Sequence, residues 1–219
     1  MRKTLIAVTV FLLVSVLSLA VSAEELVFFD SFEDNTIGEK PAGWELTHDL
    51  AAQVVDAASG RVSDGNLAAV LNNTPDLYGE IVQEIPEVVE GKMMVDFYQP
   101  SAIRDNINIE VHSASGRLIG VFVTGSGNVR PRPAGQQTEN LVNLPNDRWH
   151  TLVLTWNAEG FNVYYLDAVG NQIVILENAE FDPAGVEGGA ASKILLNVSR
   201  REDLKQAYFD NVRVYDLAK

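Results

Sequence analysis

Residues 148–167, RWHTLVLTWNAEGFNVYYLD, form two runs in which apolar and polar side chains alternate. Alternation with a period of two is typical of β-strands, because successive side chains of a strand point to opposite faces. The runs are joined by Asn157-Ala158-Glu159-Gly160, a short polar connection with a glycine, as hairpin turns commonly have. The stretch therefore predicts a β-hairpin whose aromatic residues pack across the strands and into a core. These residues are Trp149, Trp156, Phe161 and Tyr165.

The same alternation recurs along most of the chain, and turn-forming residues separate one run from the next. No stretch carries an apolar stripe of helical spacing that is long enough to predict a helix. About a dozen short strands without intervening helices favour an all-β fold, an antiparallel two-sheet β-sandwich of the jelly-roll kind. The expected strands are Leu26–Phe32, Gln53–Asp56, Asn66–Leu71, Tyr78–Ile85, Gly91–Tyr98, Asn106–Ser113, Arg117–Thr124, Arg148–Asn157, Phe161–Asp167, Asn171–Leu176, Ser192–Ser199 and Gln206–Tyr215.

Residues 1–23 are typical of a secretory signal peptide. Arg2 and Lys3 give a basic start, residues 5–20 are nearly all apolar, and Val21-Ser22-Ala23 supplies small residues. We expect cleavage after Ala23, which leaves residues 24–219 as one jelly-roll domain that is secreted or periplasmic. No other run approaches the roughly 18 apolar residues of a membrane-spanning helix, so no membrane insertion is expected after cleavage.

The chain is strongly acidic, with 30 Asp and Glu against 16 Lys and Arg and a net charge of −14. Such a surface repels phosphate backbones and anionic lipids, so nucleic acid is not an expected partner. There is no cysteine, which excludes disulfides and zinc–thiolate sites. No organic cofactor is expected. The charge is compatible with divalent cations or neutral glycans.

Two further stretches stand out besides the hairpin. They are residues 28–34 (FFDSFED), followed by Pro41-Ala42-Gly43-Trp44, and the closing run 209–215 (FDNVRVY). Together with the hairpin they resemble the concanavalin A-like lectin and glucanase superfamily, and within it the laminin-G-like domains of secreted bacterial proteins. The resemblance implies a concanavalin A-like jelly roll. It does not choose a function, because this fold hosts lectins, glycanases, lyases and adhesion modules.

The resemblance also implies one structural calcium ion where the first and last strands lie side by side. The matching carboxylates are Asp210 in the closing strand and Asp30 or Glu33 in the opening one, with a backbone carbonyl near Gly65 as a further ligand. Calcium takes about six to eight oxygen ligands, which suits carboxylates and carbonyls from distant segments. The alternative is that Asp30 and Asp210 are strand-end carboxylates that accept hydrogen bonds from turn amides.

A polar face is predicted along residues 106–112, because alternation sends the isoleucine and valine side chains to the core. If this strand neighbours those that carry Asp96, Tyr98 and Asn197, a groove rich in planar hydrogen-bonding groups results, and sugars are recognised by such groups. The alternative is the solvated outer face of an antiparallel sheet, which alternates in the same way. The candidate ligand-binding residues are Asp96, Tyr98, Asn106, Asn108, Glu110, His112, Arg130 and Asn197.

These features favour an exported, non-catalytic carbohydrate-binding module whose partner is an oligo- or polysaccharide. Glycanases of this fold place their carboxylates on one strand as E-x-D-x-x-E, and the chain has no such run. A glycoside hydrolase that pairs Glu110 with Asp96 is one alternative. A polysaccharide lyase that uses Tyr98 and His112, with Arg130 near a uronate, is another. A protein–protein interaction or adhesion module is the third.

Overall fold

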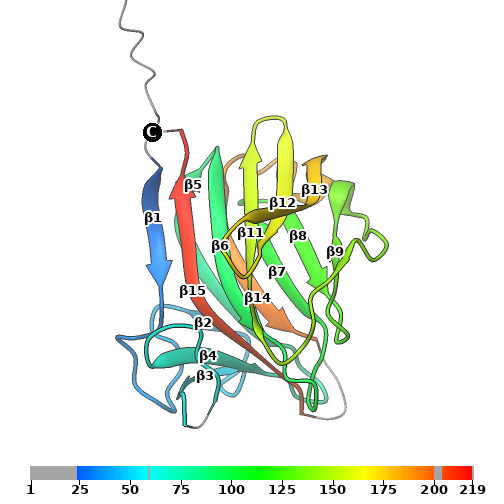
Figure 1. The fold of residues 1–219 in the computed structure, drawn as a ribbon. Helices are drawn as coiled ribbons and strands as arrows, with labels where there is room; N and C mark the ends of the chain where they lie inside the picture. The colour runs from blue at the N-terminus through cyan, green and yellow to red at the C-terminus, as the bar shows by residue number, and fades with distance from the viewer. Residues whose placement is uncertain (1–23, 59, 200–203, 219) are drawn as a thin grey trace, which may run out of the picture.

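The computed structural model describes residues 24–58, 60–199 and 204–218, and the predicted signal peptide, residues 1–23, lies outside the described residues. Two antiparallel sheets pack face to face (Figure 1). The predicted all-β jelly-roll sandwich is therefore confirmed. In the part of the chain that the structure describes, no helix is long and apolar enough to cross a membrane.

Sheet A lies toward the viewer in Figure 1 and has the strand order β13-β12-β11-β6-β15-β4-β3, with β1 also paired to β15. Its strands are β1 (Glu25–Asp30), β3 (Ala52–Asp56), β4 (Leu67–Asn72), β6 (Gly91–Tyr98), β11 (Trp149–Asn157), β12 (Gly160–Leu166), β13 (Gln172–Ala179) and β15 (Gln206–Asp216).

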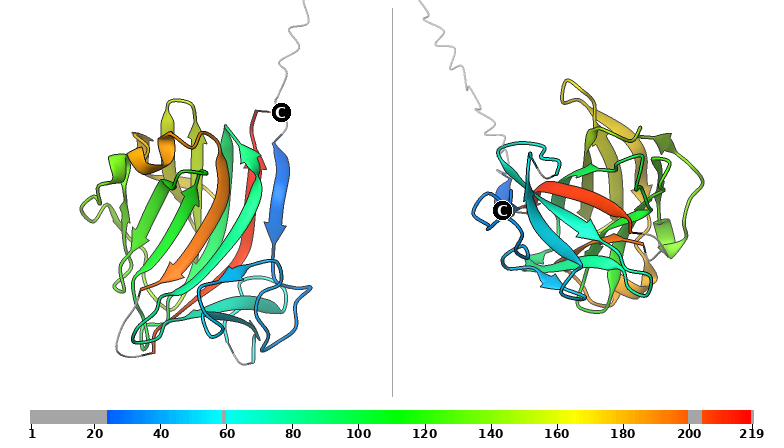
Figure 2. Two further views of the ribbon diagram at one scale, coloured as in Figure 1. Left: turned by 180° about the vertical axis from the view of Figure 1, so that it is seen from behind. Right: turned by 90° about the horizontal axis from the view of Figure 1, so that it is seen from below.

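Sheet B has the order β10-β9-β8-β7-β14-β5-β2 and faces the viewer in the left view of Figure 2. Its strands are β2 (Glu45–Leu46), β5 (Gly79–Val88), β7 (Ile107–His112), β8 (Arg117–Val123), β9 (Asn128–Pro131), β10 (Val142–Asn143) and β14 (Ala191–Val198). The helices are the short η1 (Pro133–Gly135) and α1 (Pro183–Val186), both of which contact β8.

The hairpin predicted at residues 148–167 is formed by β11 and β12. Its register places Trp156 opposite Phe161, and both rings are buried between the sheets. The indole Nε1 of Trp156 donates a hydrogen bond of 3.2 Å to the carbonyl of Val88. Trp149, at the start of β11, packs instead against a second, smaller apolar cluster. The predicted packing role of these aromatic residues is confirmed.

Each strand expected from the sequence is present, and β6 has the predicted bounds Gly91–Tyr98. The sequence does not predict β2, β9 or β10, because strands of two to four residues are too short to show alternation. Two of these strands, together with η1, divide residues 125–147, which carry no regular pattern in the sequence. This segment borders the outer face of sheet B.

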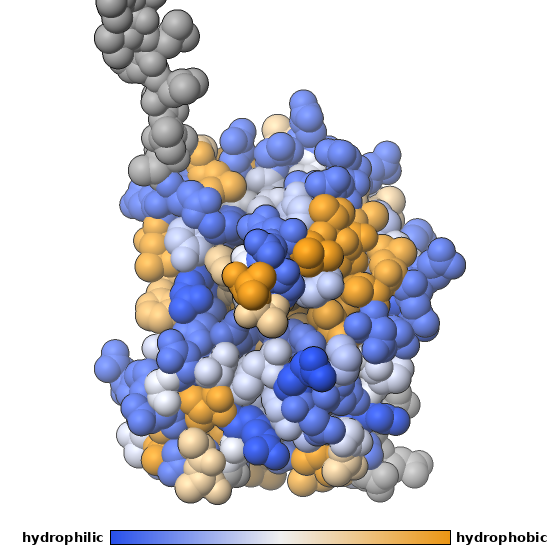
Figure 3. All heavy atoms as spheres, in the orientation of Figure 1, coloured by the Kyte–Doolittle hydropathy of each residue, from blue (hydrophilic) through white to orange (hydrophobic). Residues whose placement is uncertain are grey.

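The outer face of sheet A is mixed polar and apolar in Figure 3, with apolar atoms gathered over the β12–β13 hairpin. The exposed apolar side chains of this hairpin are Val169, Ile173 and Val174. They lie on and beside β13, the edge strand of sheet A. The predicted ligand-binding strand belongs to the other sheet, so this apolar patch is separate from it.

Candidate functional site

The predicted polar strand is β7, which lies between β8 and β14 in the middle of sheet B. Its isoleucine and valine side chains are buried in the core, so Asn108, Glu110 and His112 project from the outer face, as predicted. Asn197 of β14 lies directly opposite Asn108. Although they face outward, Asn108 and Asn197 are only 8% exposed and Glu110 is 7% exposed. Other polar side chains therefore pack closely around them.

Hydrogen bonds connect these side chains across the sheet. Asn108 Nδ2 donates to Asn197 Oδ1 at 2.7 Å, and Asn197 Nδ2 donates to Glu80 Oε2 of β5 at 3.3 Å. From the other side, Arg132 Nη2 donates to Asn108 Oδ1 at 3.0 Å. The row spans β5, β14 and β7 and ends at the residue that precedes η1. We call it, together with Glu110 and its partners, the sheet-B network.

Glu110 is the centre of charge in the sheet-B network. His112 Nε2 lies 2.8 Å from Glu110 Oε2, Arg117 Nη1 donates to Oε1 at 3.3 Å, and Arg132 Nη1 lies 3.8 Å from Oε1. Burial alone would raise the pKa of Glu110. The hydrogen bond from His112 and the charges of Arg117 and Arg132 outweigh burial, so the pKa lies below its usual value. Glu110 is therefore ionised at neutral pH.

Arg117 and Asp182 extend the sheet-B network to the short helix α1. Arg117 Nε and Nη2 both donate to Asp182 Oδ2, at 2.9 and 2.6 Å. Asp182 Oδ1 accepts from the amide of Ala184 at 3.1 Å and so caps the first turn of α1. One carboxylate thus holds both the arginine and the helix that contacts β8.

Gly120 makes the arginine arrangement possible. It lies opposite Glu110 in the β7–β8 ladder, at a point where a side chain would project from the same face. A Cβ at this position would lie 2.9 Å from Arg117 Cδ and 3.3 Å from Arg132 Cδ. The missing side chain leaves the space through which both arginines reach Glu110.

The other two predicted residues of this face lie at its margin. Asn106 Oδ1 accepts from the amide of Gly125 at 2.9 Å and so fixes the turn after β8. Arg130 projects from β9 opposite Phe122, and its Nε donates to Asn140 Oδ1 at 2.6 Å. Arg132, rather than Arg130, reaches Glu110.

The expectation that Asp96 and Tyr98 share a groove with the polar strand is wrong. They lie on β6, which pairs with β11 and β15 in sheet A, because the connection after β6 carries the chain into the other sheet. Asp96 accepts hydrogen bonds from Thr151 Oγ1 at 2.6 Å and Ser63 Oγ at 2.8 Å. Tyr98 belongs to the second apolar cluster on that sheet.

This separation also breaks both catalytic pairs that the sequence suggests. Glu110 and His112 project from the outer face of sheet B, whereas Asp96 and Tyr98 project from the outer face of sheet A. The two layers of the sandwich core lie between them. Neither Glu110 with Asp96 nor Tyr98 with His112 can act on one substrate bond.

The residues expected around calcium meet at one turn. Glu33 Oε1 accepts from the amides of Asn66 and Leu67 at 2.7 and 2.8 Å. Asp210 Oδ2 accepts from the amides of Ser63 and Asp64 at 3.0 and 3.3 Å. Carboxylates from opposite ends of the chain therefore hold the same turn, which has Gly65 at its centre.

Asp30, the other predicted metal ligand of the opening strand, bonds to Phe32 and Trp44 and not to this turn, and burial raises its pKa as it does that of Asp210. Asp30 accepts from the amide of Phe32 and from Trp44 Nε1, both at 2.7 Å. Burial raises the pKa of Asp210 to about 6, although three backbone amides oppose this shift. Among the described residues, no group of three or more His, Cys, Asp and Glu side chains lies close enough to hold a metal ion. A calcium ion at this turn would therefore need backbone carbonyls beside Glu33 and Asp210.

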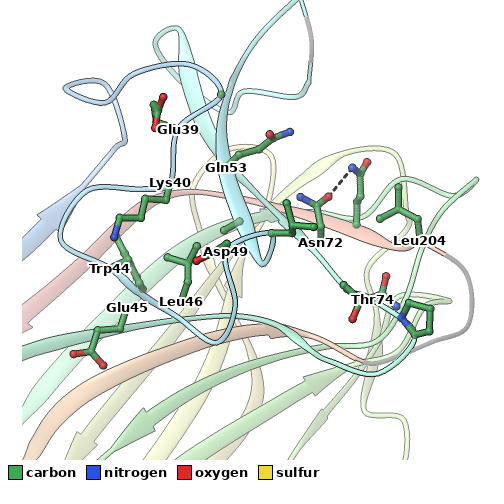
Figure 4. Close-up of a pocket in the computed structure, with 16 residues that line it drawn as sticks. Glu39, Lys40, Trp44, Glu45, Leu46, Asp49, Gln53, Asn72, Thr74 and Leu204 are labelled. Atoms are coloured by element: carbon green, nitrogen blue, oxygen red, sulfur yellow. Dashed lines mark hydrogen bonds between the residues drawn. The ribbon is translucent and has the colours of Figure 1, made fainter.

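A cavity of about 930 Å³ lies at the end of the sandwich where β2, β3 and β4 meet (Figure 4). The sequence predicts none of its lining, because the residues come from segments far apart in the chain. We call it the end cavity. It is lined by Gly38, Glu39, Lys40, Trp44, Glu45, Leu46, Asp49, Leu50, Ala52, Gln53, Asn72, Asn73, Thr74, Pro75, Leu204 and Gln206.

No protein-family model matches the chain, and no curated protein matches it. Several solved structures, in contrast, match the fold of the chain. A sialidase superposes with a TM-score of 0.66 and 14% identity, over 90% of this chain and 19% of the sialidase chain. The chain thus spans less than a fifth of that protein's length.

Two glucanases superpose over nearly their whole length. The GH16 non-specific endo-β-1,3(4)-glucanase SCLam has a TM-score of 0.58 and 15% identity, over 88% of this chain and 91% of its own. The laminarinase from Rhodothermus marinus has a TM-score of 0.56 and 17% identity, over 89% and 98%. These similarities show that the chain has the concanavalin A-like jelly-roll fold.

Proposed function

We propose that this chain is a non-catalytic carbohydrate-binding module that contacts an oligo- or polysaccharide with the outer face of sheet B. The observation that carries the proposal is the sheet-B network, in which planar amide, carboxylate and guanidinium groups are fixed on neighbouring strands. Groups held in place before binding lose little conformational freedom when a ligand arrives. The carbohydrate-active enzymes among the structural neighbours support a sugar as the ligand class.

Two details of the face suit a sugar. Arg132 Nε is buried without an acceptor among the described residues, so a ligand hydroxyl would satisfy this donor once the guanidinium shifts toward the surface. Phe122 lies opposite Asn108, and the Arg132 guanidinium stands 5.5 Å from the centre of its ring. An apolar ring beside planar polar groups matches the mixed surface of a sugar.

Binding to a glycan panel tests this proposal, with Phe122→Ala as the variant and Phe29→Ala as the control. Phe29 is a half-exposed ring on β1 in sheet A, so its removal deletes the same group far from the network. We expect Phe122→Ala to weaken binding at least about tenfold, or about 1.4 kcal/mol, with no change for Phe29→Ala. Equal binding by all three proteins, or no binding to any glycan, would refute the proposal.

A glycoside hydrolase is a second candidate because the same face holds two carboxylates in different states. Burial raises the pKa of Glu80, and the charge of Glu110 adds to this, whereas the pKa of Glu110 is lowered. Glycoside hydrolysis requires a carboxylic acid that donates a proton and a second, ionised carboxylate, and the opposite pKa shifts of Glu80 and Glu110 favour these two roles. The two residues lie two strands apart and two residues out of register, so their backbones are about 12 Å apart by strand geometry, and the side chains would have to lean toward each other to approach the separation of an inverting pair.

Release of reducing ends from the glycans that bind would distinguish the two candidates. If the chain hydrolyses them, Glu80→Gln and Glu110→Gln each abolish the release, while Glu84→Gln, on the same face of β5, leaves it intact. If wild type and variants release nothing from a glycan that binds, the non-catalytic proposal stands and the hydrolase is excluded.

We further propose a calcium ion at the turn around Gly65, held by Glu33, Asp210 and backbone carbonyls, as in laminin-G-like domains. A ligand that binds only the folded chain stabilises it by mass action. Chelation should therefore lower the melting temperature at neutral pH and excess calcium should restore it, whereas the double variant Glu33→Gln, Asp210→Asn should not respond.

Export is proposed from the predicted signal peptide, and a mature N-terminus at Glu24 in the secreted or periplasmic fraction would verify it.

A further inference from the structure

Five of the polar side chains that line the end cavity make no side-chain bond within the part of the chain that the structure describes. Among the described residues, Glu39, Glu45 and Asp49 accept no side-chain hydrogen bond or ion pair, and Lys40 and Gln53 make none either. All five are exposed. A ligand can therefore bond to these groups without displacing a side-chain partner within the described chain.

The wall of the end cavity combines amides with apolar surface. Gln206 Nε2 donates to Asn72 Oδ1 at 2.8 Å, which orients the Asn72 amide and leaves its Nδ2 without an acceptor among the described residues (Figure 4). Leu50 and Leu204 line the same cavity and are 72% and 58% exposed. Exposed leucines beside oriented amides offer both parts of a sugar, its C–H faces and its hydroxyls, a complementary surface.

The charge of the end cavity selects among saccharides. The lining carries three carboxylates, Glu39, Glu45 and Asp49, and one ammonium group, Lys40, on a protein whose net charge is −14. A uronate or sulfated sugar would be repelled, and a neutral sugar would gain nothing from the excess negative charge. A sugar with a protonated amine would gain.

We propose that the end cavity is a second binding site, specific for a saccharide that carries free amino groups. The inference rests on the proposed function for taking the ligand to be a saccharide, and it adds a site and a ligand class. The volume of about 930 Å³ lies near the upper end of small-ligand pockets, so the cavity has room for an oligosaccharide rather than one ring.

The position of the cavity separates it from the sheet-B network. Glu45 and Leu46 form β2, the edge strand of sheet B, while Gln53 and Asn72 belong to β3 and β4 in sheet A. The network is centred on β7, and β14, β5 and β2 follow it in the sheet. Strand spacing puts β2 about 14 Å from β7, where Glu110 lies, whereas Glu80, the outermost member of the network, lies on β5 beside β2. Phe122, the test residue of the first site, lies on β8, beyond β7 and farther still from the cavity.

Titration calorimetry with an oligosaccharide of free amino sugars, and with its N-acetylated counterpart of equal length, tests the proposal. We expect the amino form to bind more tightly and to weaken at high salt, because the attraction is electrostatic and lies near the surface. The double variant Glu45→Gln, Asp49→Asn should bind the amino form about tenfold more weakly. The matched control, Glu159→Gln with Glu180→Gln, removes two exposed carboxylates outside the cavity lining, one in the β11–β12 turn and one directly after β13, and should bind as wild type does.

The possible outcomes distinguish the second site from the proposed function. Equal binding of the amino and N-acetylated forms, or full binding by the cavity variant with a normal melting curve, overturns the second site. If the amino form does not bind while another glycan binds in a Phe122-dependent manner, the second site fails and the proposed function survives. If no glycan binds at all, both fail.

Discussion

The sheet-B network and the end cavity treat polar side chains in opposite ways. In the network, Asn108, Glu110 and Asn197 are nearly buried, and each is hydrogen-bonded to another side chain. At the rim of the cavity, Glu45 and Asp49 are exposed and have no such partners among the described residues. We therefore expect the first region to contribute to stability as well as to the proposed binding, and the second only to the proposed binding.

The physical reason is the cost of burying charge. A buried carboxylate is tolerated only with partners, and its loss leaves those partners unpaired. An exposed carboxylate interacts mainly with water, so its removal costs little. Stability and binding measurements should consequently separate in the two regions.

The largest effect is expected for Glu110→Ala. It leaves Arg132 without its carboxylate in a largely buried site, while Arg117 loses one of its two carboxylates and keeps Asp182. Removing one partner of a buried ion pair costs about 3 kcal/mol or more, and the partial exposure of both arginines places the value near that lower limit. Denaturant unfolding measures it, and a loss below about 1 kcal/mol would show that the network is a solvated surface.

The second-largest effect is expected at acid pH, which should lower the contribution of the sheet-B network to the free energy of unfolding. The pKa of Glu110 is lowered from 4.5, so the carboxylate contributes its full stabilisation above pH 4.5 and loses it as the pH falls through the lower folded-state value. Glu110→Gln cannot titrate there. The difference in unfolding free energy between wild type and Glu110→Gln should therefore shrink below pH 4.5, and a difference that stays constant with pH would contradict the assigned ion pairs.

Gly120→Ala should have a smaller effect that links stability to binding. The added methyl group would press on the side chains of Arg117 and Arg132, which are flexible enough to move aside. We expect a loss of about 1 kcal/mol and weaker glycan binding, because both arginines shift from Glu110. The control is Gly170→Asn, where a side chain meets open space and asparagine tolerates the positive φ of 86°. Equal stability and binding for Gly120→Ala would show that the missing side chain at this position is not needed for the arginines to reach Glu110.

The strands can be predicted from the sequence because the alternation of apolar and polar residues depends only on neighbouring positions. Strands such as β6 and β7, and the Trp156–Phe161 pair of the hairpin, can be predicted from neighbouring residues. The sheet to which each strand belongs cannot. Asp96 and Asn108 both lie on polar faces of consecutive strands, yet the chain crosses between the sheets after β6, so the predicted groove divides in two.

The candidate site could be predicted only where it lies on one strand. Asn108, Glu110 and His112 share a face of β7 through alternation alone, and alternation also predicts the face on which Asn197 of β14 lies. Arg132 and Asp182 come from segments without a regular pattern, and the contacts of Arg132 with Glu110 and of Asp182 with Arg117 depend on how those segments cross sheet B. The lining of the end cavity also depends on how distant segments meet, although Gln53 and Gln206 lie on strands that the sequence predicts.

The smallest expected effect is on stability in the end cavity. Glu45→Gln with Asp49→Asn should change the unfolding free energy by less than about 0.5 kcal/mol, because both carboxylates are exposed and neither has a partner within the described chain. The sign should be slightly favourable, since the variant reduces the repulsion within a protein of net charge −14. A loss comparable to that of Glu110→Ala would mean that the cavity rim is structural and that the contrast with the sheet-B network is wrong. A neutral result, combined with lost binding of the amino saccharide, would show a surface whose acidic groups serve a ligand and not the fold.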